Sequence, residues 1–79
     1  MTQDEIDAFV ARSEAIYERR LRDQLEVAHR DDFVAIEPES GDYFLGKTLR
    51  EATQAARKVH PGRMTHSIRI GHRAAIHLG

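Results

Sequence analysis

The chain has 79 residues, no cysteine and a net charge of −1, which describes a single small domain. Without cysteine it has neither a disulfide nor a thiolate metal site, so two common stabilising devices of small folds are excluded. No apolar run approaches the roughly 20 residues that span a bilayer. Thr2-Gln3-Asp4-Glu5 is acidic, unlike a secretion signal. We therefore expect a cytoplasmic, bacterial-type protein with no membrane partner.

The charges are unevenly distributed along the chain. Residues 1–32 hold nine acidic and five basic side chains, whereas residues 33–79 hold four acidic and seven basic ones. From Arg57 onward there are five bases and four histidines but no acid. This asymmetry indicates either an anionic partner for the C-terminal part or packing of that part beside the acidic helix of the same chain. We favour the second interpretation.

Residues 1–30 are predicted to form one long helix. Thr2-Gln3-Asp4-Glu5 has the pattern of a capping box, with a hydroxyl at the N-cap and a glutamate three residues later. Since neither glycine nor proline occurs before Pro38, the helix is expected to continue to about His29. Apolar residues recur along one face, with Ser13 interrupting them. They are Ile6, Phe9, Val10, Ile16, Tyr17, Leu21, Leu25 and Ala28.

This helix is longer than the domain that it has to cover. A helix of about 27 residues is roughly 40 Å long, whereas a compact domain of this size is about 30 Å across. The helix is therefore expected either to bend near Arg12-Ser13 or to extend beyond the sheet. In the second case we predict a homodimer of antiparallel helices, with Asp4, Glu5 and Asp7 near Arg19, Arg20 or Arg22 of the second copy. The predicted interface residues are Ile6, Phe9, Val10 and Tyr17.

Residues 33–46 are predicted to form a β-hairpin. The strand from Phe33 to Glu37 is apolar on both faces, and the strand from Asp42 to Leu45 returns antiparallel to it. Pro38-Glu39-Ser40-Gly41 has the composition of a tight turn. Gly41 is expected to adopt a positive φ, which glycine does without steric cost, and Gly46 is expected to end the second strand.

The remaining residues predict a helix and two strands. Thr48-Leu49-Arg50-Glu51 is a second capping box, and Pro61-Gly62 stops the helix that follows it. Alternation predicts a strand over residues 64–70 and an edge strand over residues 74–78. The expected fold class is α+β, in the order α-β-β-α-β-β. A long helix (1–30) precedes a ββαββ unit (31–79) in one domain (1–79), with one helix packed on a small antiparallel sheet.

The sequence contains no recognisable catalytic or cofactor motif. Four histidines lie within 18 residues: His60, His66, His72 and His77. Their spacings of six, six and five residues match no common zinc-binding pattern. Ser40 and Ser67 lack the motif of an activated nucleophile, and Gly41-Asp42 lacks the context of a phosphate-binding loop. We therefore expect neither an enzyme nor a metal or cofactor site.

Nucleic-acid binding is the alternative function. Five basic side chains of the C-terminal part are candidates for contacts with phosphates: Arg57, Lys58, Arg63, Arg69 and Arg73. However, the sequence has no helix-turn-helix, zinc-finger or aromatic stacking motif, and its pI is near 6.5. We therefore treat nucleic acid as the second hypothesis.

Several motifs resemble those of a small uncharacterised bacterial protein family with a tyrosine-bearing helix, a "fvAi-sGdy" hairpin and an "RIG" strand. The similar segments are Ile16-Tyr17-Glu18, Leu25-Glu26, Phe33-Val34-Ala35-Ile36, Ser40-Gly41-Asp42-Tyr43 and Ile68-Arg69-Ile70-Gly71. The resemblance covers residues 15–79. It implies an antitoxin-like protein or a small partner of a neighbouring retropepsin-like aspartic protease. The strand–strand–helix order also loosely resembles antitoxin domains of the HicB kind.

These resembling motifs are structural, so the resemblance transfers no functional residue to this chain. The leading hypothesis is a non-enzymatic protein-interaction module, which is antitoxin-like or the partner of a protease. Its expected partners are a second copy of the chain and another protein.

Overall fold

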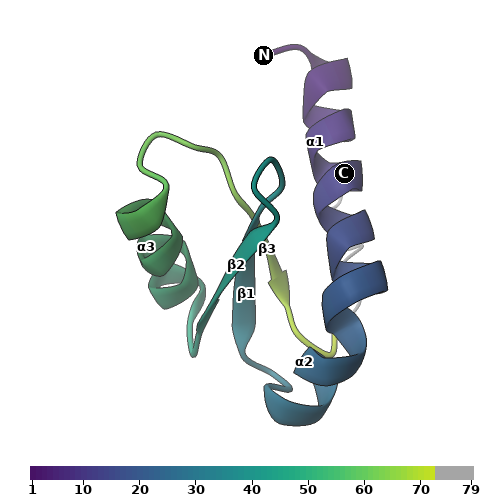
Figure 1. Ribbon diagram of the computed structural model, residues 1–79, viewed down its shortest axis with the longest axis vertical. Coiled ribbons are helices and arrows are strands. Elements are labelled where there is room, and N and C mark those ends of the chain that lie inside the picture. Colours follow the sequence, from purple (N-terminus) through teal and green to yellow (C-terminus); the bar gives the residue numbers. More distant parts are fainter. Residues whose placement is uncertain (73–79) are drawn as a thin grey trace.

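The computed structural model describes residues 1–72 and has the predicted α+β class (Figure 1). Its helical elements are α1 (Gln3–Ile16), the π-helical segment η1 (Tyr17–Leu21), α2 (Arg22–Ala28) and α3 (Leu49–Val59). Its strands are β1 (Phe33–Glu37), β2 (Asp42–Gly46) and β3 (His66–Arg69). Over the described residues the order is therefore α-β-β-α-β. The strand predicted at 74–78 lies outside these residues, and β3 is shorter than the predicted 64–70.

The sheet is antiparallel with the strand order β2-β1-β3. Ile36 of β1 pairs with Tyr43 of β2 on one side and with His66 of β3 on the other. Figure 1 shows α3 on one face of this sheet and the long helix of α1, η1 and α2 on the other. β1 is thus covered by strands at both edges and by helices on both faces. This position explains why its sequence is apolar without alternation.

The larger part of the core lies between the sheet and the long helix. Its buried members come from η1, α2, β1, β3 and the residue directly after β3: Tyr17, Leu21, Leu25, Val34, Ile36, Ile68 and Ile70. Tyr17, Leu21 and Leu25 are spaced by four residues. In a regular α-helix, each such step would rotate the side chain by about 40° around the helix axis. The wider π turn of η1 offsets this rotation, so Tyr17, Leu21 and Leu25 all face the sheet.

The smaller part of the core lies between the sheet and α3. Ala35, Ala52 and Ala56 are buried there, with Phe33 and Phe44 packed against them. These alanines let α3 approach the sheet closely. Gly46 serves the same purpose, because a Cβ atom on Gly46 would lie only 2.5 Å from the Ala52 nitrogen. The role of Gly46 is therefore close approach and not only strand termination.

The helix starts largely follow the predicted capping chemistry. Thr2 Oγ1 accepts a hydrogen bond from Glu5 N, and Glu5 Oε1 accepts one from Thr2 N, which completes the first capping box. At α3, Thr48 Oγ1 accepts from Glu51 N, but the Glu51 carboxylate accepts from Lys47 N rather than from Thr48 N. The second predicted capping box is therefore incomplete: Thr48 caps the helix, but the Glu51 carboxylate binds the N–H of Lys47 instead of that of Thr48.

The long helix does not break at Ser13. The Ser13 hydroxyl donates to the Phe9 carbonyl within the helix, at 2.9 Å, so its polar group is satisfied although the residue is fully buried. The other expectation for this helix, an extension beyond the sheet, is the one that the structure realises.

Candidate interaction surfaces

The N-terminal part of α1 projects from the rest of the molecule. Figure 1 shows its first turns running past the tip of the β1–β2 hairpin and the α3–β3 connection. Only Ser13 among the 14 residues of α1 is buried. We refer to residues 3–12 as the overhang. This segment is held by its capping box and its own helical hydrogen bonds more than by tertiary packing.

The overhang carries apolar side chains that the described residues cover only in part. Ile6 is 37% exposed, whereas Phe9 and Val10 are half-buried. The Phe9 ring meets the His66 ring edge-on, with centroids 6.5 Å apart. Met1 and Met64 lie at the same end of the molecule and are 72% and 48% exposed. A partner would therefore find an adaptable apolar surface there.

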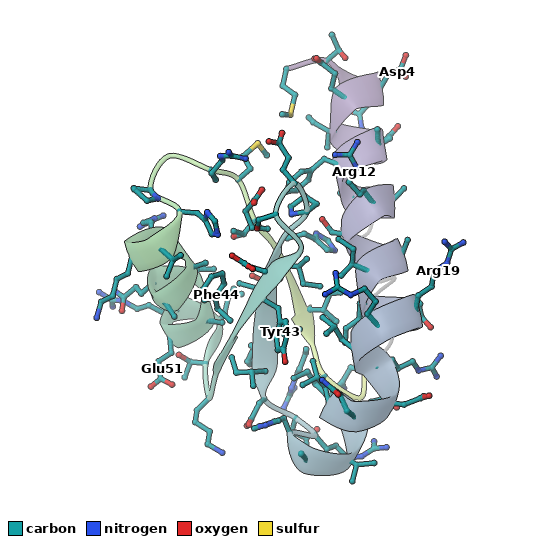
Figure 2. All side chains as sticks on the ribbon, in the orientation of Figure 1. Asp4, Arg12, Arg19, Tyr43, Phe44 and Glu51 are labelled. Atoms are coloured by element: carbon teal, nitrogen blue, oxygen red, sulfur yellow. The ribbon has the colours of Figure 1, made fainter. Side chains whose placement is uncertain are left out.

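A groove of about 430 Å³ runs beside the overhang, between α1, the hairpin tip and the segment 62–64. Its residues on the α1 side are Met1, Glu5, Ala8, Phe9 and Arg12. Its residues on the opposite side are Glu37, Pro38, Glu39, Gly62, Arg63 and Met64. Both walls thus combine apolar side chains with charges of either sign. Figure 2 shows Asp4 and Arg12 along the outer part of α1.

Glu37 is a buried carboxylate in the wall of this groove. Its oxygens accept hydrogen bonds from Ser40 N at 2.8 Å and from Glu39 N at 3.1 Å, and Arg63 Nη1 lies 3.7 Å away. Burial by itself raises the pKa of Glu37, but hydrogen bonds from Ser40 and Glu39 and the charge of Arg63 outweigh it and lower the pKa. Glu37 therefore stays charged and fixes the turn from inside.

Tyr17 does not belong to the exposed surface, although the helical pattern groups it with Ile6, Phe9 and Val10. It is only 3% exposed and sits in the core against the sheet. Burial is the main cause that raises the pKa of its phenol, and the nearby Glu26 carboxylate adds to the increase. Its hydroxyl donates to Glu26 Oε2 at 3.4 Å. Tyr17 therefore anchors the long helix and is not accessible to a partner.

Of the three expected ion-pair partners of the overhang, Arg19, Arg20 and Arg22, only Arg22 forms ion pairs within residues 1–72. Arg22 bridges Glu18 and Glu26 along the same helix. The Arg20 guanidinium lies against Gly41, since a Cβ atom there would be 2.9 Å from Arg20 Nη1. Arg12 is the basic residue on the overhang itself. Arg19 and Arg20 lie on η1, outside residues 3–12, so a pairing limited to the overhangs uses Arg12.

One polar contact joins α1 to β3. Glu14 Oε2 and His66 Nε2 lie 3.4 Å apart, and neither buried atom makes a hydrogen bond within residues 1–72. The alternation in β3 predicts His66 on the apolar face, where it is found, but the sequence gives no sign of its acidic neighbour 52 positions away. This contact links the base of the overhang to the sheet.

The predicted basic residues do not form one patch. Arg57 and Arg63 line the same depression, and Arg63 also pairs with Glu39. Lys58 is exposed on α3 but does not line that depression, Arg69 lies over the Phe33 ring at 5.8 Å, and Arg73 lies outside the described residues. The prediction missed Arg50, which lines a second depression together with Arg57. Arg50 is seven residues, or two helical turns, before Arg57, and this spacing could have predicted that the two side chains share one side of the helix.

The favoured interpretation of the charge asymmetry does not apply to α3. This helix lies on the face of the sheet opposite the acidic long helix (Figure 1). Within residues 1–72, Arg50, Arg57, Lys58 and Arg69 make no salt bridge with any acidic side chain. The bases of α3 are therefore directed to solvent.

The described histidines contact different acids and do not converge. His60 Nε2 lies 2.8 Å from Asp42 Oδ2, and His72 Nε2 lies 2.7 Å from Asp31 Oδ1, where His72 lowers the pKa of Asp31. No group of three metal-ligating side chains occurs within residues 1–72. Ser40 Oγ also lies 3.4 Å from His60, but from the same Nε2 that faces Asp42. A serine–histidine–aspartate relay needs both ring nitrogens, so this arrangement is a turn contact.

Comparison of the chain with protein-family models, curated proteins and solved structures finds no match. In the part of the chain that the structure describes, no helix combines the length and apolarity required to cross a bilayer.

Proposed function

We propose that this protein is a non-enzymatic protein-interaction module that pairs with a second copy through the overhang. The observation that carries the proposal is a capped helix, α1, of which a single residue is buried within residues 1–72. An apolar stripe that continues beyond the sheet favours a partner that covers it. The second copy is the partner that the charges of the overhang fit.

The geometry limits this pairing to a short antiparallel overlap. Each sheet reaches its own helix at Phe9, beside His66, and buries it fully at Ser13, so about ten residues, roughly 15 Å of helix, are open or only partly covered. Antiparallel overhangs then meet about a twofold axis between Ala8 and Phe9. The sheet and α3 of each copy would then lie beyond the N-terminal end of the other copy's overhang.

The charges of the overhang suit this register. Glu5 and Arg12 are seven residues apart and line the same groove, so they lie on one side of the helix. With the axis between Ala8 and Phe9, Glu5 of one copy is opposite Arg12 of the other, and the symmetry makes this pair twice. Ile6, Phe9 and Val10 are then covered at the centre.

The energy available is adequate for association. Fully burying one large apolar side chain stabilises by about 1.5–3 kcal/mol, and the stability of a small domain is only about 5 kcal/mol. Completing the burial of Ile6, Phe9 and Val10 on two chains is therefore a substantial contribution for a fold that lacks disulfides.

Sedimentation equilibrium at tens of micromolar tests the proposal. We expect the wild type to be dimeric and Phe9→Asp to be monomeric, because a carboxylate at the centre of the interface would be desolvated. Val27→Asp is the matched control, since Val27 is an apolar residue of the same long helix and is 87% exposed far from the overhang. It should leave the dimer intact.

A second pair of variants tests the register. Arg12→Glu should weaken the dimer by placing like charges opposite each other, whereas Arg12→Lys should retain it. A monomeric wild type, or a dimer that survives Phe9→Asp, would contradict the proposed interface.

The resemblance to antitoxin-like and protease-associated proteins concerns a second kind of partner and stays a prediction. Pull-down of the tagged protein from its native host tests it, with Phe9→Asp as a control for contacts through the overhang. Recovery of a protease or a toxin-like protein would support the prediction, and recovery of the same proteins by an unrelated tagged domain would contradict it.

A further inference from the structure

The two outer layers of the molecule have opposite electrostatic character. The long helix and the loop after it, within residues 1–32, hold nine acids and five bases. Across the sheet, α3 carries Arg50, Arg57 and Lys58 and a single acid, Glu51, whose carboxylate accepts a hydrogen bond from Lys47 N. A polyanion approaching the molecule would be repelled by the long helix and attracted to the α3 side.

A shallow depression of about 740 Å³ lies on this basic side, between α3 and β3. Its lining is Leu49, Arg50, Thr53, Gln54, Arg57, Thr65 and Ser67. It contains no acidic residue, and six of its seven side chains are cations, hydroxyls or an amide. A neighbouring depression shares Thr53, Arg57 and Thr65 and adds Arg63 and Met64. Together they form one continuous surface, which we call the α3–β3 face. Its donors are on Arg50, Gln54, Arg57, Thr65 and Ser67, because the Thr53 hydroxyl already donates to carbonyls of α3 and Arg63 pairs with Glu39.

Sheet geometry and helix periodicity bring these residues together. Residues 65, 67 and 69 alternate with buried Ile68 and Ile70 and so lie on the face of the sheet that α3 covers. α3 packs mainly over β2 and β1, which leaves the side of the helix toward β3 open. Arg50 and Arg57, two turns apart, both point to that open side, about 10 Å from each other along the helix axis.

The position of Arg50 is unfavourable for the helix alone. It occupies the first turn of α3, where the helix dipole favours acidic side chains, and within the described residues it has no acidic partner. An anion bound beside it would remove this cost, because the anion would interact favourably with both the guanidinium and the N-terminal end of α3.

We propose that the α3–β3 face binds the phosphodiester backbone of a nucleic-acid strand. Arginine guanidinium groups bind phosphate oxygens in bidentate geometry, and threonine and serine hydroxyls donate additional hydrogen bonds to phosphates. The separation of Arg50 and Arg57 suits different phosphates of one strand rather than a single phosphate ion. Since the depression has no aromatic lining, bases are not stacked and recognition is independent of sequence.

Fluorescence anisotropy with labelled single-stranded DNA and RNA of about 15 nucleotides tests this proposal. We expect binding at about 20 mM salt and a strong loss of affinity by about 200 mM. About three phosphate contacts give a slope of log K against log salt near −2 for a single strand. Inorganic phosphate at the same total phosphate concentration should compete at least about tenfold less well, because it cannot bridge the two arginines.

The decisive variant is Arg50→Gln with Arg57→Gln. It should weaken binding at least about fivefold at low salt and reduce the salt slope by about 1.4, which corresponds to two lost contacts. Replacement of both residues by lysine should restore most of the affinity. Both side chains are exposed, so circular dichroism should report an unchanged fold.

Two matched controls locate the effect. Lys58→Gln removes a charge from the other flank of α3, and Arg19→Gln removes one from the long helix, where Figure 2 shows Arg19 pointing away from the body. Neither should change affinity by more than about twofold. Absence of binding at low salt, equal losses in the controls, an unaffected double variant or equal competition by inorganic phosphate would each overturn the proposal.

Strand binding does not depend on the proposed dimer, because the overhang and the α3–β3 face belong to different layers. Phe9→Asp should be monomeric and still bind the strand through the α3–β3 face. A Phe9→Asp monomer that binds the strand is therefore the result that both proposals predict. Loss of strand binding in a folded Phe9→Asp monomer would overturn the assignment to the α3–β3 face.

Discussion

Individual residues in this protein combine several structural roles. Glu37 is both the last residue of β1 and the hydrogen-bond acceptor for the turn that follows, and it is only 2% exposed. A buried carboxylate is stable only when it is paired and hydrogen-bonded. The N–H groups of Ser40 and Glu39 and the Arg63 guanidinium meet this requirement.

The lowered pKa of Glu37 makes a pH-dependent contribution to stability. Because the folded pKa is below the unfolded one, the contribution is present above the unfolded value of about 4.3 and is lost as pH falls through the folded value. Glu37→Gln should therefore destabilise by about 1–3 kcal/mol at pH 7, and this difference should shrink below pH 4. Urea denaturation at pH 7 and pH 3 measures both differences.

Glu39→Gln is the control for this experiment, since Glu39 is the exposed neighbour in the same turn. A surface change of this kind should alter stability by no more than about 0.5 kcal/mol. A Glu37→Gln defect that is independent of pH would contradict the role given to the carboxylate charge.

At the scale of elements, the docking of α3 on β2 depends on a single glycine. A Cβ atom at Gly46 would lie 2.5 Å from Ala52 N and 2.7 Å from Glu51 Cβ, atoms of the helix that cannot swing aside. Gly46→Ala should therefore push α3 from the sheet and destabilise by about 1–3 kcal/mol. Thermal unfolding followed by circular dichroism measures the loss.

Gly62→Ala separates this steric effect from backbone strain. Gly62 has φ +82°, but a Cβ atom there would have no other atom within 4 Å, so alanine costs only the left-handed conformation, about 1–2 kcal/mol. The shared alanine side chain makes the two variants comparable. If Gly46→Ala left α3 docked and the melting temperature unchanged, the close approach would not govern this contact.

At the scale of the whole molecule, the structure is a sheet between two dissimilar helical layers. The longest dimension is 35 Å and the shortest 20 Å, so the long helix sets the shape. One layer ends in the apolar overhang and the other presents the α3–β3 face. The two proposed interactions thus use mainly opposite sides of the sheet, and their surfaces adjoin at Arg63 and Met64.

Self-association makes thermal stability depend on protein concentration. If the overhangs pair, the wild-type melting temperature should rise by about 5 °C over a hundredfold increase in concentration. Phe9→Asp should show a melting temperature that is independent of concentration, because its monomer has no association equilibrium to shift. A wild-type melting temperature that stays constant over this range would argue for a monomer.

The sequence by itself determined the kinds of elements and most of their ends, because these depend on interactions between near neighbours. Thr2 and Thr48 are N-caps as predicted, Gly41 adopts φ +80°, and Pro61-Gly62 follows the end of α3. The α+β class followed from the order of these elements. The length of the first helix also indicated that it either bends near Arg12-Ser13 or extends beyond the sheet, and the choice between the two depended on the tertiary structure.

Only the tertiary structure decided which face of each element is covered. It placed Tyr17 in the core, set Gly46 beneath α3, brought Arg50 to the same surface as Arg57 and put His66 beside Glu14. These relations join residues that are distant in the sequence or on different faces of one helix. They are determined by how the layers pack, and local pattern does not contain that information. The same reason explains why the four described bases do not form one patch: Arg57 and Lys58 lie on α3, Arg63 lies in the connection after it, and Arg69 lies on β3.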